Sequence, residues 1–199
     1  MSVESFIPGA TAVGIAYKDG TILGAEKRIA YGRFLISKTG KKLFRINSTS
    51  GAACAGMIAD MQVLMRELTA YVKLREFELR RPLPPKSVTK LMSVIMFERR
   101  YYPLLAQVVV GGQADKPLVY VLDPLGSIIP DEYASVGTGA EIAIGILESE
   151  YTPDMSEAKA KDLAVKAIKA ACQRDLASGN GIDLLISSRN EMKEESLVI

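Results

Sequence analysis

The side chains that could perform catalysis in this chain exclude the commonest mechanisms before they suggest one. The 199 residues contain no histidine, which removes the usual general base and the commonest metal ligand. The two cysteines, Cys54 and Cys172, lie far apart in apolar surroundings, so we expect buried free thiols. We expect no metal and no cofactor, and a hydrolase built from this sequence must take its base from another group.

Two glycine-containing segments fail as nucleotide-binding motifs. Leu35 stands where a phosphate loop ending at Lys41 needs its first glycine. Ile142 stands where a dinucleotide fingerprint starting at Gly137 needs its last glycine. Neither segment therefore predicts a nucleotide site.

The charge of the chain predicts no polyanionic partner. There are 25 basic and 23 acidic residues, a net charge of +2, so we expect neither nucleic acid nor an anionic membrane surface as a ligand. The cluster from Arg99 to Tyr102 is interpreted as a solvated helix end. No apolar run approaches the 18 residues of a membrane span, and Glu4 argues against a secretory signal, so we expect a cytoplasmic protein.

Strand signals dominate the first quarter of the chain. Apolar runs at 11–17 and 21–25 flank Lys18-Asp19-Gly20, a typical hairpin turn. A second pair of strands is predicted at 33–37 and 43–46, joined by residues 38–41. Residues 52–55 are expected to complete the first sheet.

The remaining elements alternate in blocks, and their order predicts the fold class. Helical periodicity and strand composition predict helices at 57–80 and 88–101, strands at 104–110 and 118–122, helices at 139–149 and 156–176, and a strand at 182–187. The region 190–195 is expected to be a solvated tail. Blocks of strands and paired helices favour a single α/β domain with two stacked antiparallel sheets covered by helices, a four-layer αββα sandwich.

Seven segments, taken together, resemble a known family. In order and spacing they are similar to the β subunits of the archaeal proteasome core particle, and they cover the chain from Ala10 to about residue 188. The segments are Ala10-Thr-Ala-Val-Gly-Ile, Gly24-Ala-Glu-Lys-Arg28, Gly40-Lys-Lys-Leu-Phe44, Ala55-Gly-Met-Ile-Ala-Asp-Met-Gln62, Val110-Gly-Gly112, Gly137-Thr-Gly139 and Gln173-Arg-Asp-Leu-Ala-Ser-Gly179. The resemblance implies the N-terminal-nucleophile hydrolase fold, which agrees with the fold class predicted from the pattern.

The resemblance also implies a mechanism that needs no histidine. In the family a threonine at the mature N-terminus attacks the peptide carbonyl, and its own α-amine, with an ordinary pKa near 8, serves as the base. Lys42 matches the lysine that lowers the pKa of the nucleophile, and Glu26 matches the acid that keeps this lysine charged.

Four further residues match family positions. Asp175 and Ser178 match the pair that orients the amine, and the Gly56 N–H matches the oxyanion donor. Thr138 stands where active members usually carry serine. Without the nucleophile, the retained residues are interpreted mainly as scaffold. Glu26 is expected to form a semi-buried ion pair with Lys42 or, alternatively, with Arg28, and Asp175 and Ser178 are expected to be helix-end hydrogen-bonding groups.

Ala10 occupies the position of the nucleophilic threonine. We therefore expect a catalytically inactive proteasome β subunit that contributes to ring assembly and chamber walls. Because removal of a leader needs the threonine hydroxyl, residues 1–9 are expected to remain as a propeptide-like leader before a single domain at 10–199. The resemblance implies α subunits and active β subunits of a seven-membered ring as partners, and unfolded proteins as substrates of the whole complex.

Alternative hypotheses remain open. The chain could be a threonine protease in which Ala10 is an introduced replacement, or one that uses Thr11. Strand alternation argues against Thr11, because Ala10, Ala12, Gly14 and Ala16 share one face and Thr11 points to the other. A stand-alone amidase for small molecules fits poorly, since no segment is left over to build a separate substrate pocket.

Overall fold

The computed structural model describes residues 9–32, 34–189 and 191–199, and it contains two five-stranded antiparallel sheets. The first sheet has the order β10 (Tyr133–Gly137), β1 (Thr11–Tyr17), β2 (Gly20–Glu26), β11 (Ile182–Ser188), β12 (Met192–Leu197). The second has the order β5 (Leu43–Arg45), β6 (Ser50–Gly56), β7 (Ala106–Gly112), β8 (Val119–Leu122), β9 (Ile129–Asp131). A separate two-stranded ribbon joins β3 (Ile29–Tyr31) to β4 (Phe34–Ser37).

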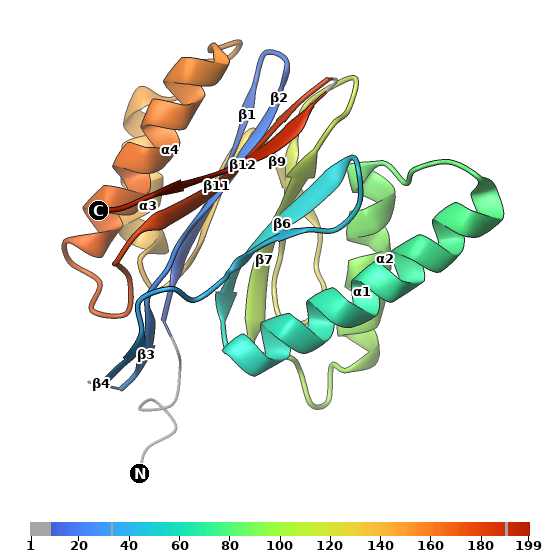
Figure 1. Ribbon diagram of the computed structural model, residues 1–199, viewed down its shortest axis with the longest axis horizontal. Helices are drawn as coiled ribbons and strands as arrows, with labels where there is room; N and C mark the ends of the chain where they lie inside the picture. Colours follow the sequence, from blue (N-terminus) through green and yellow to red (C-terminus); the bar gives the residue numbers. More distant parts are fainter. Residues whose placement is uncertain (1–8, 33, 190) are drawn as a thin grey trace.

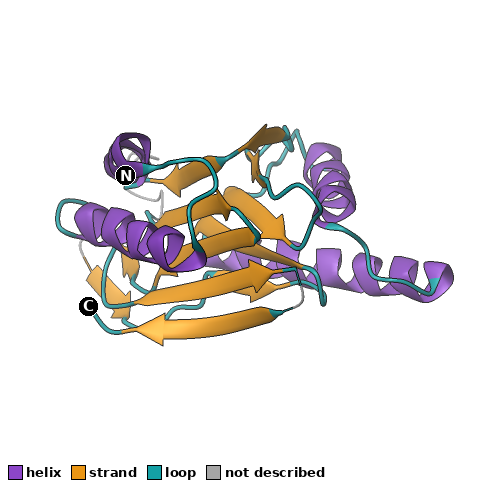
Figure 2. Cartoon of the chain, turned by 90° about the horizontal axis from the view of Figure 1, so that it is seen from above, coloured by secondary structure: helices purple, strands orange, loops and turns teal. Residues whose placement is uncertain are grey.

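Two pairs of helices cover the outer faces of the sheets. Helices α1 (Ile58–Leu79) and α2 (Pro85–Glu98) lie against the second sheet, and α3 (Ala140–Glu150) and α4 (Glu157–Cys172) lie against the first (Figure 1). The view from above shows the strands enclosed between the helix pairs (Figure 2). The predicted four-layer αββα sandwich is confirmed.

Three buried clusters fill the three spaces between the four layers. Val13 and Ile15 of β1 pack with α3 and α4, whereas Ala10 and Ala12 pack between the two sheets. Val108 and Val110 of β7 likewise face α1 and α2, and Val109 faces the other sheet. Because both faces of the central strands are buried, these strands are apolar at nearly every position. The face assignment predicted for Ala10 and Ala12 is therefore confirmed.

Local turn chemistry predicts the first hairpin correctly. Tyr17 pairs with Gly20 across the two-residue turn Lys18-Asp19, and Ala12 pairs with Ala25 at the other end. The predicted helices are also present, although α2 ends at Glu98 and α4 at Cys172, a few residues before their predicted ends. Helix ends are the least certain part of a periodic pattern, because the terminal turns lack the repeats that define it.

The predicted second hairpin is wrong. Strand β4 pairs with β3, and β5 pairs with β6 in the other sheet, so the segments at 34–37 and 43–45 are not partners; Arg33 lies outside the described residues. Residues 52–55 belong to β6 of the second sheet, so the prediction that they complete the first sheet is also wrong. The side chains of Phe34 and Ile36 are largely exposed, whereas Leu43 is buried between the sheets. Turn residues mark where a strand ends, but they do not identify its partner.

The predicted solvated tail is also wrong, apart from Asn190, which lies outside the described residues. Residues 192–197 form β12, the edge strand beside β11. The Lys and Glu side chains of β12 made this segment look like a solvated tail. An edge strand tolerates such charges, because one of its sides is open to solvent.

Candidate active site

Position 10 lies directly before β1, at the end of the space between the two sheets. Ala10 is fully buried, with 0% of its surface exposed. The backbone around it is crowded: a Cβ atom added to Gly137, which has φ +98°, would lie 2.1 Å from the Ala10 carbonyl oxygen. A Cβ added to Gly9 would lie 2.4 Å from the Thr138 hydroxyl oxygen. Glycine at these neighbours is what allows the chain to pass this close to position 10.

Thr138, Asp175 and Ser178 form a hydrogen-bonded cluster beside position 10. The hydroxyl groups of Thr138 and Ser178 each lie 2.6 Å from Asp175 Oδ2. The Ala10 backbone N–H donates to Thr138 Oγ1 at 3.2 Å. Each hydroxyl has one proton, and the carboxylate can only accept, so both protons point to Asp175 and the lone pairs of Thr138 face Ala10. The tertiary structure thus brings these three predicted residues together.

Thr11 belongs to the same cluster, but on the other side of the strand. Its hydroxyl lies 2.8 Å from Ser178 Oγ, and its side chain is buried. Because the Ser178 proton is donated to Asp175, Thr11 must donate its own proton to Ser178. A hydroxyl held in this way, and facing away from position 10, is poorly placed to act as a nucleophile.

Glu26 and Lys42 form a buried ion pair, with 0% and 1% of their side chains exposed. Glu26 Oε1 accepts from Lys42 Nζ, while Oε2 accepts backbone N–H bonds from Arg28 at 2.7 Å and Gly179 at 2.9 Å. Lys42 also donates to the Arg28 carbonyl. The Arg28 side chain does not pair with Glu26; its Nε donates to Asn180 Oδ1. Both oxygens of the carboxylate are therefore satisfied.

Burial shifts the pKa of both members of this pair toward the neutral form. Desolvation raises the pKa of Glu26, against the opposing effects of Lys42 and the two backbone N–H groups. Desolvation also lowers the pKa of Lys42, against the opposing charges of Glu26 and Asp175. The charge of Asp175 thus acts on Lys42, which connects the ion pair electrostatically to the hydroxyl cluster. A buried lysine with a lowered pKa is a candidate for proton chemistry.

Gly56 is the last residue of β6, and its backbone requires glycine. Its φ is +130°, and an added Cβ would lie 2.2 Å from the Leu105 carbonyl oxygen. Gly56 and Thr138 both border a cavity of about 340 Å³ between the ends of the two sheets. Gln107 also lines this cavity. Sequence reasoning missed this residue because a single glutamine in an apolar strand forms no motif.

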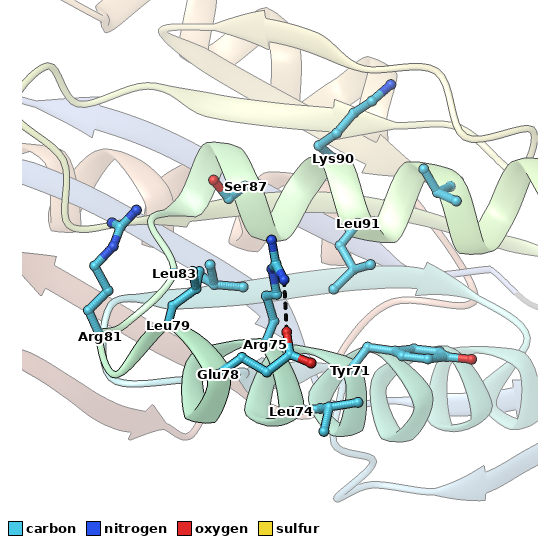
Figure 3. A pocket seen from close by; sticks show the side chains of 11 residues that line it. Tyr71, Leu74, Arg75, Glu78, Leu79, Arg81, Leu83, Ser87, Lys90 and Leu91 are labelled. Atoms are coloured by element: carbon cyan, nitrogen blue, oxygen red, sulfur yellow. Dashed lines mark hydrogen bonds and ion pairs between the residues drawn. The ribbon is translucent and has the colours of Figure 1, made fainter.

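A larger hollow of about 500 Å³ lies elsewhere, between α1 and α2 (Figure 3). The labelled side chains come from these two helices and the turn between them, and Arg75 pairs with Glu78 at 2.8 Å. None of the predicted site residues lines this hollow. It is therefore separate from the candidate active site.

The cysteines and the acidic residues offer no metal site in the part of the chain that the structure describes. Both thiols are free; Cys54 is buried as predicted, but Cys172 is only half-buried. Burial raises the pKa of the Cys172 thiol to about 12, which leaves it protonated and unreactive at neutral pH. Among the described residues no helix is long and apolar enough to cross a membrane.

Comparison with known proteins gives matches along almost the whole chain. A family model described as "Proteasome subunit" matches residues 8–187. The chain is 53% identical to "Proteasome subunit beta 1" of Nitrosopumilus maritimus over 192 residues, covering 96% of this chain and 97% of the relative. It is 54% identical to "Proteasome subunit beta 1" of Cenarchaeum symbiosum, covering 94% and 97%, and 50% identical to "Proteasome subunit beta 2" of Pyrobaculum calidifontis, covering 95% and 94%.

Proposed function

This chain belongs to the proteasome β-subunit family, and from that premise we propose that it is an inactive β subunit of the proteasome core particle. The observation that carries the proposal is Ala10: the Thr138–Asp175–Ser178 cluster lies beside a residue whose side chain has no atom able to attack a carbonyl. Covalent catalysis requires such a nucleophile. The surrounding groups then serve as scaffold for a subunit that contributes to ring geometry and the chamber wall.

The remaining groups keep the arrangement that a threonine at position 10 would use. In an Ala10→Thr variant, the nitrogen of residue 10 would become a free α-amine after cleavage, next to Thr138 and Asp175, and would accept the proton of the new hydroxyl. Lys42 would favour the alkoxide as it forms, and the Gly56 N–H would donate to the oxyanion. Each of these roles is a proposal that the substituted chain can test.

The proposal extends to partners, processing and location. Without a hydroxyl at position 10 the bond after Gly9 has no internal nucleophile, so residues 1–9 stay attached to a domain at 10–199; residues 1–8 lie outside the described residues. The chain assembles with proteasome α subunits and with active β subunits in a seven-membered ring in the cytoplasm. Unfolded proteins are substrates of that whole complex.

The decisive experiment compares Ala10 with Ala10→Thr in particles assembled with α subunits and with no other β type. We expect no peptidase activity and an intact leader for the unmodified chain. We expect measurable hydrolysis and loss of the first nine residues for Ala10→Thr, followed by peptide turnover and intact-mass measurement. Hydrolysis by the unmodified particle, or a mass that begins at Ala10 or Thr11, would overturn the proposal.

The competing hypothesis is an active threonine protease, either one that uses Thr11 or one in which Ala10 replaces an original threonine. A Thr11→Val substitution separates the first form from the proposal, since Val removes the hydroxyl and keeps the branched shape. If the unmodified particle hydrolysed peptides and Thr11→Val abolished that activity, Thr11 would be the nucleophile. We expect Thr11→Val to weaken the Ser178 contact and to leave hydrolysis by Ala10→Thr measurable.

A further inference from the structure

A groove at one edge of the second sheet carries positive charge that its own lining does not balance. It lies between α1 and β5, has a volume of about 520 Å³, and is here called the α1–β5 groove. Arg45, Arg66 and Lys73 line it together with Phe44 and Met65, and none of the described residues that line it is acidic. We propose that this groove receives the acidic β9–β10 edge of a second copy of this chain. The inference rests on the ring assembly of the proposed function.

The three cations of the groove are available to an acidic partner. The side chains of Arg45, Arg66 and Lys73 are exposed, and none of them forms an ion pair within residues 9–32, 34–189 and 191–199. Cations gathered in one concave site add their fields there and attract a negative surface. Phe44 and Met65 contribute apolar surface beside them. The groove therefore fits a partner that carries carboxylates next to an exposed apolar side chain.

The opposite edge of the same sheet has the complementary composition. Strand β9 is the edge strand there, and its three residues are all exposed. It leads through the exposed Glu132 into β10, which is the edge strand of the first sheet. The segment from residue 117 to residue 158 contains acidic residues but no lysine and no arginine. This β9–β10 edge also carries Ile129, which is 55% exposed, two positions before Asp131.

The acidic side chains of this edge gather in space as well as in sequence. The Tyr133 hydroxyl donates to the Glu148 carboxylate, and this bond, supported by the charge of Asp131, raises the pKa of Tyr133 to about 12. Burial, and then the charge of Glu132, raises the pKa of Tyr151 to about 12. Two phenols on different elements thus experience the same negative field. The β9–β10 edge is therefore an anionic surface.

The distribution of charge determines how two copies meet. Two α1–β5 grooves facing each other would repel, and so would two β9–β10 edges. A groove set against an acidic edge joins unlike surfaces, which is a head-to-tail contact, and repetition of such a contact generates a ring when the rotation closes. Because β5 and β9 are the two edge strands of the second sheet, one copy can use both surfaces at once.

Pro130 determines that the contact is made by side chains. It lies in the middle of β9, and a proline has no N–H to donate, so a strand of the neighbour cannot extend the sheet regularly beyond β9. Ile129 and Asp131 are two positions apart and project from the same side of the strand. In the proposed contact Ile129 packs on Phe44, and the carboxylates of Asp131 and Glu132 meet the cations of the groove.

The first test reverses the charge of each surface in particles assembled with α subunits and with no other β type. The groove variant is Arg66→Glu/Lys73→Glu, and the edge variant is Asp131→Lys/Glu132→Lys. We expect each to lower the yield of assembled particles by about tenfold or more, measured by native mass spectrometry, because like charges then face each other. The chain that carries all four substitutions should recover at least half of the original yield. Equal yields of the single-surface variants, or no recovery in the combined variant, would overturn the inference.

Matched controls place the same charge changes elsewhere on the surface. Lys18→Glu changes an exposed lysine in the turn between β1 and β2. Glu191→Arg changes an exposed glutamate directly before β12. Neither residue lines the α1–β5 groove or belongs to the β9–β10 edge. Both controls are expected to assemble like the unmodified chain, and a loss as large as that of the groove variant would count against a specific contact.

The second test needs no substitution. Particles are built from an equal mixture of unlabelled and ¹⁵N-labelled copies and treated with a carbodiimide, which joins a lysine amine to a carboxylate within contact distance. We expect mixed-isotope peptides in which Lys73 of one copy is joined to Asp131 or Glu132 of another. Links from Lys73 mainly to an α subunit, or mainly to other carboxylates of this chain, would overturn the inference.

The outcomes separate this inference from the proposed function. If the unmodified chain assembles and neither charge reversal nor cross-linking identifies the two surfaces, the inference fails and the proposed function stands. If particles form only when an active β subunit is supplied, the neighbour is not a second copy, so the inference again fails alone. If no particle forms under either condition, the proposed ring assembly fails together with the inference.

Discussion

Glu26 and Lys42 are each candidate site residues, and each also affects the stability of the fold through their buried ion pair. The two side chains meet in the interior, where the loss of water is repaid only by the attraction between them and by the backbone bonds to Glu26. Removal of one partner leaves a buried charge without compensation. Under the proposed function the same pair is scaffold in the present chain and would serve a nucleophile in Ala10→Thr.

We expect Glu26→Ala to lower the free energy of unfolding by about 3–5 kcal/mol, because Lys42 keeps its burial and loses its carboxylate. Urea denaturation monitored by circular dichroism measures the change. The matched control is Glu78→Ala, which removes a carboxylate from a pair with Arg75 whose side chains are more than half exposed. This control is expected to change the stability by less than about 1 kcal/mol, and equal effects of both variants would contradict the argument.

At the level of the elements, the end of β10 and the start of β1 approach one another so closely that Gly137 has no room for a side chain. Thr11 pairs with Gly137 across the two strands, and Gly137 has φ +98°. This approach carries Thr138 to the nitrogen of Ala10 and lets Asp175, beyond the end of α4, complete the cluster. The geometry of the site is thus set by where β10 and α4 end and where β1 begins.

We expect Gly137→Ala to disturb both the site and the fold. The new Cβ would meet the Ala10 carbonyl oxygen at 2.1 Å in a backbone conformation that L residues rarely adopt, so either β10 or position 10 must move. In the Ala10→Thr background we expect at least a tenfold loss of peptidase activity and a destabilisation of about 1–3 kcal/mol. Peptide turnover and urea denaturation measure these changes.

Gly145→Ala is the control for this glycine substitution. Gly145 lies in α3, and a Cβ added to it would have no other atom within 4 Å. Here alanine is expected to stabilise the chain by about 0.5–1 kcal/mol, since glycine is a poor helix former. If Gly137→Ala behaved like Gly145→Ala, the close approach at position 10 would not limit the site.

At the scale of the whole molecule, the first strand, a helix and the last strand are tied together through one carboxylate. Glu157, at the start of α4, accepts a hydrogen bond from Tyr17 of β1 at 3.1 Å and one from Lys193 of β12 at 2.9 Å. The bond from Lys193, with help from Tyr17, lowers the pKa of Glu157 although partial burial opposes it. Three distant segments of the chain thus depend on the charge of one residue.

The lowered pKa of Glu157 predicts an acid-dependent loss of stability. A carboxyl group whose pKa is lower in the folded state stabilises the fold above its unfolded pKa, and this contribution disappears as the pH falls through the folded value. We expect the urea midpoint of the unmodified chain to fall more steeply between about pH 5 and pH 3 than that of Glu157→Gln. Glu194→Gln, in an exposed pair with Lys41 at 4.0 Å, should keep the steep profile.

Local patterns in the sequence are enough to identify most of the elements, their order and the family. Periodicity, the Asp19-Gly20 turn and the composition of the strands predict most helices and strands, because these signals depend on neighbours within a few residues. The missing histidine and Ala10 set limits on the chemistry without any coordinates. The seven matching segments also point to Glu26, Lys42, Thr138, Asp175 and Ser178 as candidates.

Which of these parts meet depends on tertiary contacts. The Thr11–Ser178 bond joins residues 167 positions apart, so no local pattern records it. The strands β4, β5 and β12 pair with their neighbours in the chain, but which neighbouring segment is the partner is settled only when the sheets pack against each other. The cavity bordered by Gly56 and Thr138 has the same origin, since its walls come from β6, β7, the Pro124 loop and the end of β10. A cavity is the space left when distant elements pack, so its shape and chemistry exist only in the folded chain.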